Sequence, residues 1–175
     1  MIRKATRNDA KEIAEIYNYY VANSIATFAE KPIPEKEMIT NINESICWFV
    51  YEENNEIIGY AYASRWKQRS AYRFTVESSV YIKPNTLNKR IGTQLYTKLL
   101  KELKILKIHV VIGGMSLPNK ASQLLHEKFG FKKVAHFKEV GFKFNKWIDV
   151  GYWELLMNYP EAEPLKYQAE KTSLD

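Results

Sequence analysis

Apolar side chains recur three and four residues apart in four segments of the chain. This spacing predicts amphipathic helices at about residues 10–22, 35–46, 91–103 and 119–129. The stripe that we assign to the core in the third helix consists of Ile91, Leu95, Leu99 and Leu103. Gly130 follows the fourth segment and is a typical left-handed helix stop.

Runs rich in β-branched and aromatic residues predict strands between and after these helices. We expect them at about residues 2–5, 47–51, 57–64, 72–82, 109–113, 131–136, 139–144 and 148–157. The second and third flank Asn54-Asn55, which has the turn chemistry of a hairpin. Gly113-Gly114 is expected to break the fifth, and Asn145-Lys146 to form the last turn. The order of elements indicates one mixed α/β domain.

The alternation of side chains along the predicted strand 72–82 gives it one mainly apolar face. Arg73, Thr75 and Glu77 fall on the other face, which is either a solvated sheet face or the wall of a pocket. A Pro-Asn turn, a basic loop and the start of a helix follow this strand. The first N–H groups of a helix have no partner inside it, so this arrangement can receive a phosphate. A carboxylate such as Glu77 close to a phosphorylated cofactor suggests group transfer.

Composition narrows the class of protein without choosing its partner. The 175 residues, 46% of them hydrophobic and 26% charged, fit one globular domain over 1–160 and a polar tail at 161–175. A net charge of +6 permits a nucleic acid, a phospholipid or a phosphorylated small molecule. Cys47 is the single cysteine, so an internal disulfide is excluded. The N-terminus has no apolar run, and we expect a soluble cytoplasmic protein.

Three runs carry a resemblance to a known family: YRFTVESSVYIKP at 72–84, SLPNKASQLLHEKFGF at 116–131 and VGFKFNKWIDVGYWEL at 140–155. In this order and spacing they resemble the phosphinothricin N-acetyltransferase family of the GNAT superfamily. The resemblance covers about residues 2–160 and implies a twisted, mostly antiparallel sheet flanked by helices. It also implies acetyl-CoA as co-substrate without a metal and a small amino acid substrate. We expect a homodimer without a membrane partner, and a nucleic acid is the less favoured partner.

The loop before the third helix departs from the superfamily pattern Gln/Arg-x-x-Gly-x-Gly/Ala. The matching residues run from Leu87 to Gly92, so Leu87 replaces a polar residue and Arg90 replaces a glycine. That glycine allows close approach of the backbone to phosphate. Lys89 and Arg90 add positive charge, but a side chain at position 90 can also block the phosphate-binding site sterically. Weakened binding of acetyl-CoA is therefore one alternative.

The resemblance assigns chemical roles to individual residues. Glu77 matches the proposed base, which would take a proton from the amine. His126 stands where many members have a tyrosine that protonates the thiolate, although a lone histidine here also fits a helix-surface residue. Asn119 is either a partner of the cofactor arm or a helix cap. The cofactor residues are Val80, Tyr81, Ile82, Lys89, Arg90, Ile91, Gly92, Thr93 and Asn119.

For the substrate, the resemblance implies an amino acid analogue such as phosphinothricin, methionine sulfone or methionine sulfoximine. Lys67, Arg69 and Arg73 are suited to its carboxylate or phosphinate. The remaining wall is assigned to Phe28, Tyr72 and Thr75. Phe28 belongs to a loop at 23–34 that is either a substrate lid or an anchored connector.

Two other functions remain open from the sequence. The run KKVAHFKEVGFKFNKW at 132–147 interleaves lysines with aromatic residues, as in surfaces that bind single-stranded nucleic acid. The same alternation also fits a two-faced edge hairpin. The second alternative is a homologue that binds CoA without catalysis.

Overall fold

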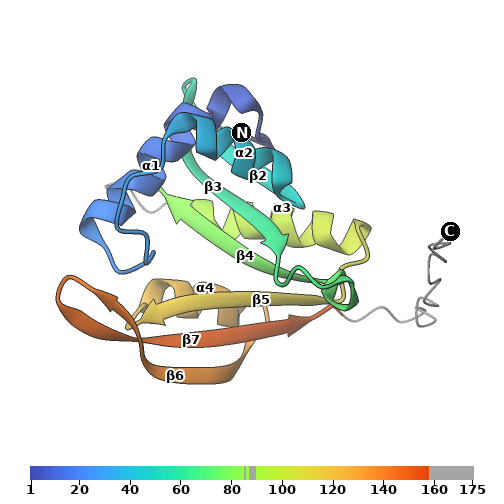
Figure 1. The fold of residues 1–175 in the computed structure, drawn as a ribbon. Coiled ribbons are helices and arrows are strands. Elements are labelled where there is room, and N and C mark those ends of the chain that lie inside the picture. Colours follow the sequence, from blue (N-terminus) through green and yellow to red (C-terminus); the bar gives the residue numbers. More distant parts are fainter. Residues whose placement is uncertain (85, 87–89, 158–175) are drawn as a thin grey trace, which may run out of the picture.

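A single seven-stranded sheet with helices on both faces forms the protein, for which a computed structural model describes residues 1–84, 86 and 90–157 (Figure 1). The strand order is β1-β2-β3-β4-β5-β7-β6. The strands are β1 Ile2–Lys4, β2 Cys47–Glu53, β3 Glu56–Arg65, β4 Thr75–Ile82, β5 Val110–Leu117, β6 Lys132–Lys143 and β7 Lys146–Leu156. The α-helices are α1 Ala10–Asn23, α2 Glu35–Glu44, α3 Ile91–Ile105 and α4 Lys120–Lys128, with short 3-10 turns η1 Arg7–Asp9 and η2 Ser70–Tyr72.

The pairing of β4 with β5 is the one parallel pairing in the described sheet, and it is short. The two strands pair only at Thr75–Val110, Val76–Val111 and Glu77–Ile112. Beyond Glu77 the two strands separate, and Figure 1 shows the gap widening toward the end of β4. The mostly antiparallel sheet that the resemblance implied is confirmed.

Two apolar clusters attach the helices to the sheet. On one face, α1 and α2 pack against Trp48, Val50 and Tyr60 of β2 and β3. On the other, α3 buries the predicted stripe, whose four side chains are at most 3% exposed. Full burial of such a side chain contributes roughly 1.5–3 kcal/mol before the entropy of folding is subtracted. The helical pattern in the sequence therefore identified the side of α3 that faces the sheet.

The β2–β3 hairpin turns at the predicted position, and Asn54 and Asn55 both adopt positive φ angles, 53° and 61°. Asparagine tolerates this left-handed region better than most residues. The last hairpin turns at Phe144 and Asn145, one residue earlier than predicted.

Three expectations about strands were wrong. The strand predicted from Tyr72 begins at Thr75, because η2 closes with a hydrogen bond from the Arg73 N–H to the Ser70 carbonyl. Tyr72 and Arg73 therefore do not share the alternating faces of β4. Gly113-Gly114 does not break β5, because β7 pairs with it along its whole length. Residues 132–143 form one strand with an irregular pairing between Phe137 and Gly141.

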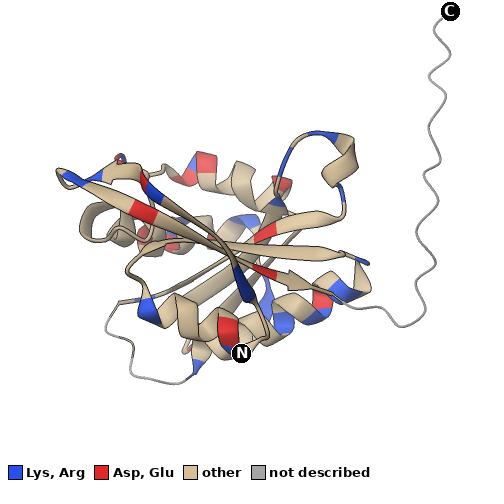
Figure 2. Cartoon of the chain, turned by 90° about the horizontal axis from the view of Figure 1, so that it is seen from below, with Lys and Arg blue, Asp and Glu red and all other residues tan. Residues whose placement is uncertain are grey.

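Charges are interspersed over the described surface. Figure 2 shows Lys and Arg on helices, strands and loops, with Asp and Glu among them. This distribution is that of a solvated surface and differs from the continuous basic stripe typical of a nucleic-acid site. Within the described ranges, no helix has the length and apolar character needed to span a bilayer.

Candidate active site

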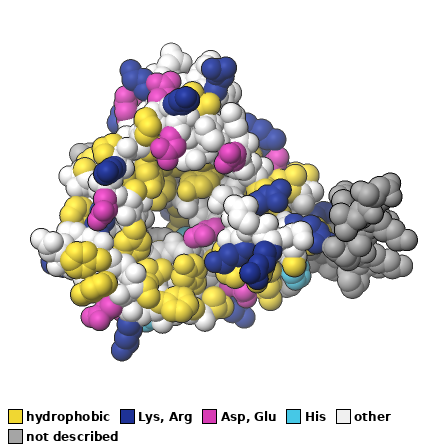
Figure 3. All heavy atoms as spheres, viewed as in Figure 1, with side chains coloured by type: hydrophobic (Ala, Val, Ile, Leu, Met, Phe, Trp, Pro, Cys, Tyr) yellow, Lys and Arg dark blue, Asp and Glu magenta, His cyan; other side chains and the backbone are white. Residues whose placement is uncertain are grey.

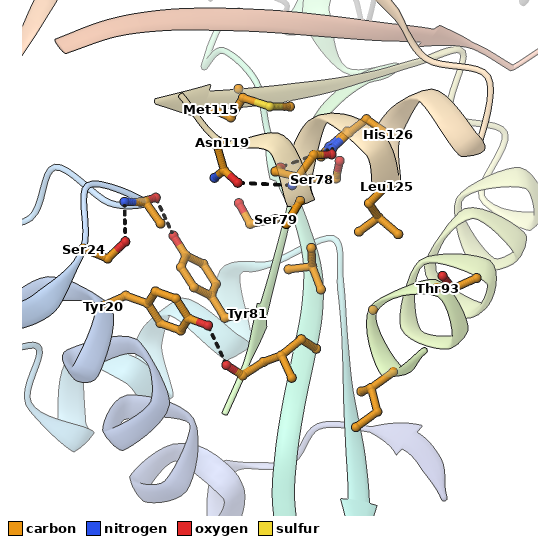
Figure 4. Close-up of a pocket in the computed structure, with 18 of the residues that line it drawn as sticks. Tyr20, Ser24, Ser78, Ser79, Tyr81, Thr93, Met115, Asn119, Leu125 and His126 are labelled. Carbon is orange, nitrogen blue, oxygen red and sulfur yellow. Dashed lines mark hydrogen bonds between the residues drawn. The ribbon is translucent and has the colours of Figure 1, made fainter. Parts of the chain in front are cut away.

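A first cavity of about 600 Å³ lies at the gap between β4 and β5. Figure 4 shows α1, β4, α3 and α4 contributing to its wall, with Tyr20 and Tyr81 on one side and Thr93 and His126 on the other. The predicted cofactor residues that line it are Val80, Tyr81, Ile82, Arg90, Ile91, Gly92, Thr93 and Asn119. Lys89 lies outside the described residues. The structure thus brings the predicted cofactor residues that it describes to one cavity.

The N-terminus of α3 faces this cavity. The first hydrogen bond within the helix runs from the Gln94 N–H to the Arg90 carbonyl, 3.0 Å, so the N–H groups of Ile91, Gly92 and Thr93 precede it. Arg90 has φ 55° and ψ 27°, a left-handed conformation that costs a non-glycine residue about 1–2 kcal/mol. The backbone at position 90 therefore keeps a conformation that glycine favours, while the Arg90 side chain is exposed. Helix amides that have no partner within the helix, beside a guanidinium, are suited to a phosphate.

Asn119 caps α4 at the opposite side of the first cavity. Its Oδ1 accepts a hydrogen bond from the Ser122 N–H at 3.1 Å. The side-chain nitrogen Nδ2 of Asn119 takes no part in this cap, and Asn119 lines the cavity (Figure 4). The two interpretations of Asn119 are therefore compatible, because capping uses one end of the amide group only.

His126 is buried, at 3% exposure, so its interpretation as a surface residue was wrong. Its ring lies against the backbone of β5, where a Cβ on Gly113 would come within 2.3 Å of Nε2. Hydrogen bonds join His126 Nε2 to the Tyr96 hydroxyl at 2.7 Å, and Tyr96 to Ser78 Oγ at 2.9 Å. His126 and Ser78 both line the first cavity. A hydrogen-bonded chain therefore links two points on its wall through a buried tyrosine.

Burial lowers the pKa of His126, which favours the neutral imidazole at pH 7. Its Nδ1 lies 2.8 Å from the Ser122 carbonyl, which can only accept, so Nδ1 carries the proton. Nε2 is then the acceptor, and the Tyr96 hydroxyl donates to it. Burial raises the pKa of Tyr96 well above its ordinary value, so this hydroxyl stays protonated.

A second cavity of about 650 Å³ shares Ala26, Gly114 and Met115 with the first. Glu77 lines it, together with residues of β5, β6, β7 and the segment after α1. Figure 3 shows a hollow near the centre of this face, with hydrophobic side chains around it. Glu77 is also the last residue of β4 that pairs with β5, so the carboxylate stands where the strands begin to separate.

Burial raises the pKa of Glu77, and the nearby positive charge of Lys67 partly opposes this shift. A higher pKa makes the carboxylate a stronger base. Close packing holds it in place, since a Cβ on Gly114 would lie 2.9 Å from Glu77 Oε1 and 3.0 Å from the Tyr152 ring. Glycine at position 114 therefore leaves room for the carboxylate beside the gap.

Of the six predicted substrate residues, Phe28 lines the second cavity with Glu77. The other five line neither cavity: Lys67, Arg69, Tyr72, Arg73 and Thr75. Lys67, Arg69 and Arg73 are exposed between β3 and β4, and the Arg73 guanidinium lies 4.5 Å from the Phe74 ring centroid. The positive charge of Lys67 lowers the pKa of Glu77.

Several residues that line or support the cavities were missed from the sequence, among them Tyr20, Ser78, Tyr96, Ser116 and Lys143. Tyr96 follows Leu95 on the buried side of α3, and a buried tyrosine hydroxyl requires a partner. That requirement was a usable signal. Lys143 had none, because it belongs to an alternating run of basic and aromatic residues.

The described part of the chain holds no group of three or more His, Cys, Asp and Glu side chains placed to bind a metal ion. The polar groups around the cavities include backbone amides, hydroxyls, the Asn119 amide, the Arg90 guanidinium, the His126 imidazole and the Glu77 carboxylate. They are suited to binding a phosphorylated cofactor and moving protons.

Residues 2–151 match the family described as "Acetyltransferase (GNAT) domain". A phosphinothricin N-acetyltransferase of Streptomyces viridochromogenes is 35% identical over 87% of this chain and 85% of its own length. An L-methionine sulfoximine/L-methionine sulfone acetyltransferase of Salmonella typhimurium is 30% identical over 90% and 94%. Among solved structures, a phosphinothricin acetyltransferase from Sinorhizobium meliloti in complex with acetyl-CoA has a TM-score of 0.88 and 30% identity, covering 98% of this chain and 96% of that one. The chain belongs to the GNAT superfamily of acetyltransferases and, within it, to the phosphinothricin N-acetyltransferase family.

Proposed function

We propose that this protein transfers the acetyl group of acetyl-CoA to the α-amino group of a small amino acid analogue of the phosphinothricin, methionine sulfone or methionine sulfoximine type. The main support is the meeting of two cavities at the gap between β4 and β5, with Glu77 at the junction. One cavity has the groups to hold a phosphorylated cofactor, and the other contains a base. Relatives with these printed activities support the substrate class.

In the first cavity, the amides of Ile91, Gly92 and Thr93 and the Arg90 guanidinium would hold the diphosphate. The segment of β4 from Val80 to Ile82, which pairs with β3 but not with β5, would bind the pantetheine arm and polarise the thioester carbonyl, with Asn119 as a further partner. When bound, acetyl-CoA supplies the acetyl group as a thioester. Lys89 is assigned to the same loop by the resemblance alone.

In the second cavity, Glu77 would accept the proton that the amine loses as the N–C bond forms. An α-amino group with a pKa of about 7.7–8.0 is partly neutral at pH 7, so one proton transfer is enough. A well-placed base contributes about 10² to 10⁴ in rate. The raised pKa of Glu77 makes it better matched to this proton than an exposed carboxylate.

The thiolate released as the C–S bond breaks takes up a proton, which balances the one lost by the amine. Ser78 and His126 line the first cavity, and the Tyr96 hydroxyl joins them. Because neutral His126 accepts at Nε2, we assign the donated proton to the hydroxyl end of this chain. His126 Nε2 has no proton to return, so His126 would orient the Tyr96 hydroxyl, and solvent would restore the donated proton and accept the one held by Glu77.

Lys67, Arg69 and Arg73 would draw the substrate carboxylate toward the loop between β3 and β4. Lys67 is close enough to Glu77 to lower the pKa of Glu77. A substrate whose carboxylate binds Lys67 would therefore place its α-amino group near Glu77. Tyr72 and Thr75 would border this route, and Phe28 would cover the side chain of the substrate.

A thiol-release assay with acetyl-CoA and a panel of amino acids and their sulfone, sulfoximine and phosphinate analogues tests this function. We expect turnover by the wild type and a loss of about 10² to 10⁴ in Glu77→Gln. Calorimetry with CoA separates the alternatives. Binding without turnover of any amine would indicate a CoA-binding homologue, and no binding at millimolar CoA would refute the proposal.

We further infer a cytoplasmic homodimer that forms through β6. This strand is at the edge of the sheet, and exposed hydrophobic side chains lie on or beside it: Val134, Phe137, Val140, Phe142, Phe144 and Trp147. An edge strand can pair with its own copy about a two-fold axis. Sedimentation of the wild type and of Trp147→Glu tests the dimer, which should dissociate in the variant. A wild type that sediments as a monomer at every concentration tested would refute it.

A further inference from the structure

We propose that Ser116 is a specificity-determining residue that binds the side-chain end of the acceptor, and that this end is an uncharged hydrogen-bond acceptor such as a sulfone or sulfoximine oxygen. The inference rests on the proposed acetyl transfer and concerns which amine is preferred. It starts from a buried polar atom that has no partner. Among the described residues, Ser116 Oγ is one of two such side-chain atoms, and it belongs to the wall of the second cavity.

The direction of the Ser116 side chain follows from the pleat of β5. Alternate residues of a strand point to the same face, so Ser116 points to the face of Gly114. On that face, a Cβ on Gly114 would meet Glu77 and the Tyr152 ring. Ser116 also stands directly opposite Val150 of β7, which lines the same cavity. The hydroxyl is therefore on the side of the sheet where Glu77 would receive the amine.

The rest of this cavity wall is mostly apolar. Twelve described residues line it, and Glu77, Ser116 and Tyr152 are the members with polar side chains. The others are Ala26, Phe28, Gly114, Met115, Phe137, Val140, Gly141, Phe142 and Val150. No described Lys, Arg or His lines it, and its carboxylate repels anions. A charged group entering this space would lose its hydration without finding a counter-ion.

These features divide an amino acid acceptor into three parts. The amine lies at Glu77, and the carboxylate lies toward the exposed cations, among which Lys67 lowers the pKa of Glu77. The side chain then extends between Phe28 and the floor formed by β5 and β7. Ser116, at 4% exposure, is buried and lacks a partner, so a neutral oxygen at the end of that side chain would satisfy it. A phosphinate there would be penalised relative to a sulfone.

Three acceptors and two variants test this inference: methionine sulfone, methionine and phosphinothricin, with Ser116→Ala and Ser45→Ala. Methionine lacks the oxygens but has the same chain. Ser45 hydrogen-bonds to the Ile42 carbonyl at the end of α2, outside both cavities, and serves as the matched control. Loss of one neutral hydrogen bond should lower kcat/KM for the sulfone by about 3- to 10-fold in Ser116→Ala. For methionine the change should stay below about twofold, as for both substrates in the control.

Equal losses on sulfone and methionine in Ser116→Ala would overturn the role of the hydroxyl. A wild type that prefers phosphinothricin to methionine sulfone would refute the claim that the side-chain end of the substrate is uncharged. Thermal unfolding of Ser116→Ala should match that of the wild type, because the hydroxyl has no partner within the described chain. Absence of thiol release by the wild type with any amine refutes the acetyl transfer itself and is distinct from these outcomes.

Discussion

Replacement of Lys143 by methionine tests whether β6 holds the segment above both cavities. Lys143 is 4% exposed, and its ammonium group donates to the Ser24 carbonyl at 2.8 Å and to the Thr27 carbonyl at 2.7 Å. Between these two residues lies Ala26, which lines both cavities, and Phe28 follows. The segment predicted as lid or connector is thus attached to a distant strand, which favours the anchored connector.

Opposing terms set the magnitude. A hydrogen bond to a charged group contributes about 1.5–3 kcal/mol, so two contribute roughly 3–6 kcal/mol. Burial of the ammonium costs several kcal/mol, and it lowers the pKa of Lys143. Methionine keeps the aliphatic stem and removes both terms, but leaves the Ser24 and Thr27 carbonyls without this donor. We expect a net loss of about 1–3 kcal/mol in unfolding free energy, or roughly 3–10 °C in Tm.

The kinetic effect should fall mainly on the amine. Phe28 contacts β6 so closely that a Cβ on Gly141 would lie 2.1 Å from its ring. Loosening of the segment would displace this ring from the second cavity, and the KM for the amine should rise about tenfold. The KM for acetyl-CoA should change less, because α3, α4 and β4 supply most of the first cavity.

Steady-state kinetics with each substrate varied, together with thermal unfolding, measures both effects. Lys146→Met is the matched control, because Lys146 is exposed in the same hairpin. An unchanged KM for the amine in Lys143→Met, or an equal rise in Lys146→Met, would show that the contact does not position the site.

Three further outcomes follow from the site. Burial raises the folded pKa of Glu77 above its ordinary value of 4.5, so the folded state loses stability as the pH rises from 4.5 through the folded pKa. Glu77→Gln should therefore unfold at an equal or higher temperature than the wild type at pH 7.5. The difference in Tm should close near pH 4. A Glu77→Gln protein with clearly lower Tm at pH 7.5 would contradict this sign. Burial lowers the folded pKa of His126 below 6.5, so the folded state loses stability as the pH falls below that value. His126→Gln should therefore flatten the dependence of Tm on pH between pH 6.5 and 5. An unchanged slope would show that His126 titrates normally. Tyr96→Phe should lower kcat about tenfold with little change in KM, as measured by thiol release, since only the hydroxyl in the chain from Ser78 to His126 is removed; an unaltered kcat would exclude Tyr96 from proton transfer.

Local patterns predicted the parts of the fold that depend on neighbouring residues. The α3 stripe and the Asn54-Asn55 turn are examples, since helical spacing and left-handed turn residues act over a few positions. The pairing of strands that are far apart in the chain was harder to predict from the sequence. The glycines of β5 looked like a break until β7 was found opposite them, and the strand start at Thr75 depended on the 3-10 turn before it.

The same limit applies to the candidate site. The cofactor residues came from the resemblance, and those described line one cavity. For His126, the sequence left a catalytic role and a helix-surface position open, because it does not show that Gly113 leaves space for the ring. Lys143 and Ser116 are ordinary members of their strands in the sequence. Their significance depends on contacts, or missing contacts, with segments far along the chain.

The three residue pairs between β4 and β5 are a weak seam that joins a four-stranded half of the protein to a three-stranded half. A ligand that fills the gap would contact both halves and reduce local opening of the β4–β5 pairing. We therefore expect CoA to slow hydrogen–deuterium exchange at amides of Val110, Val111 and Ile112, which form the seam without lining the first cavity.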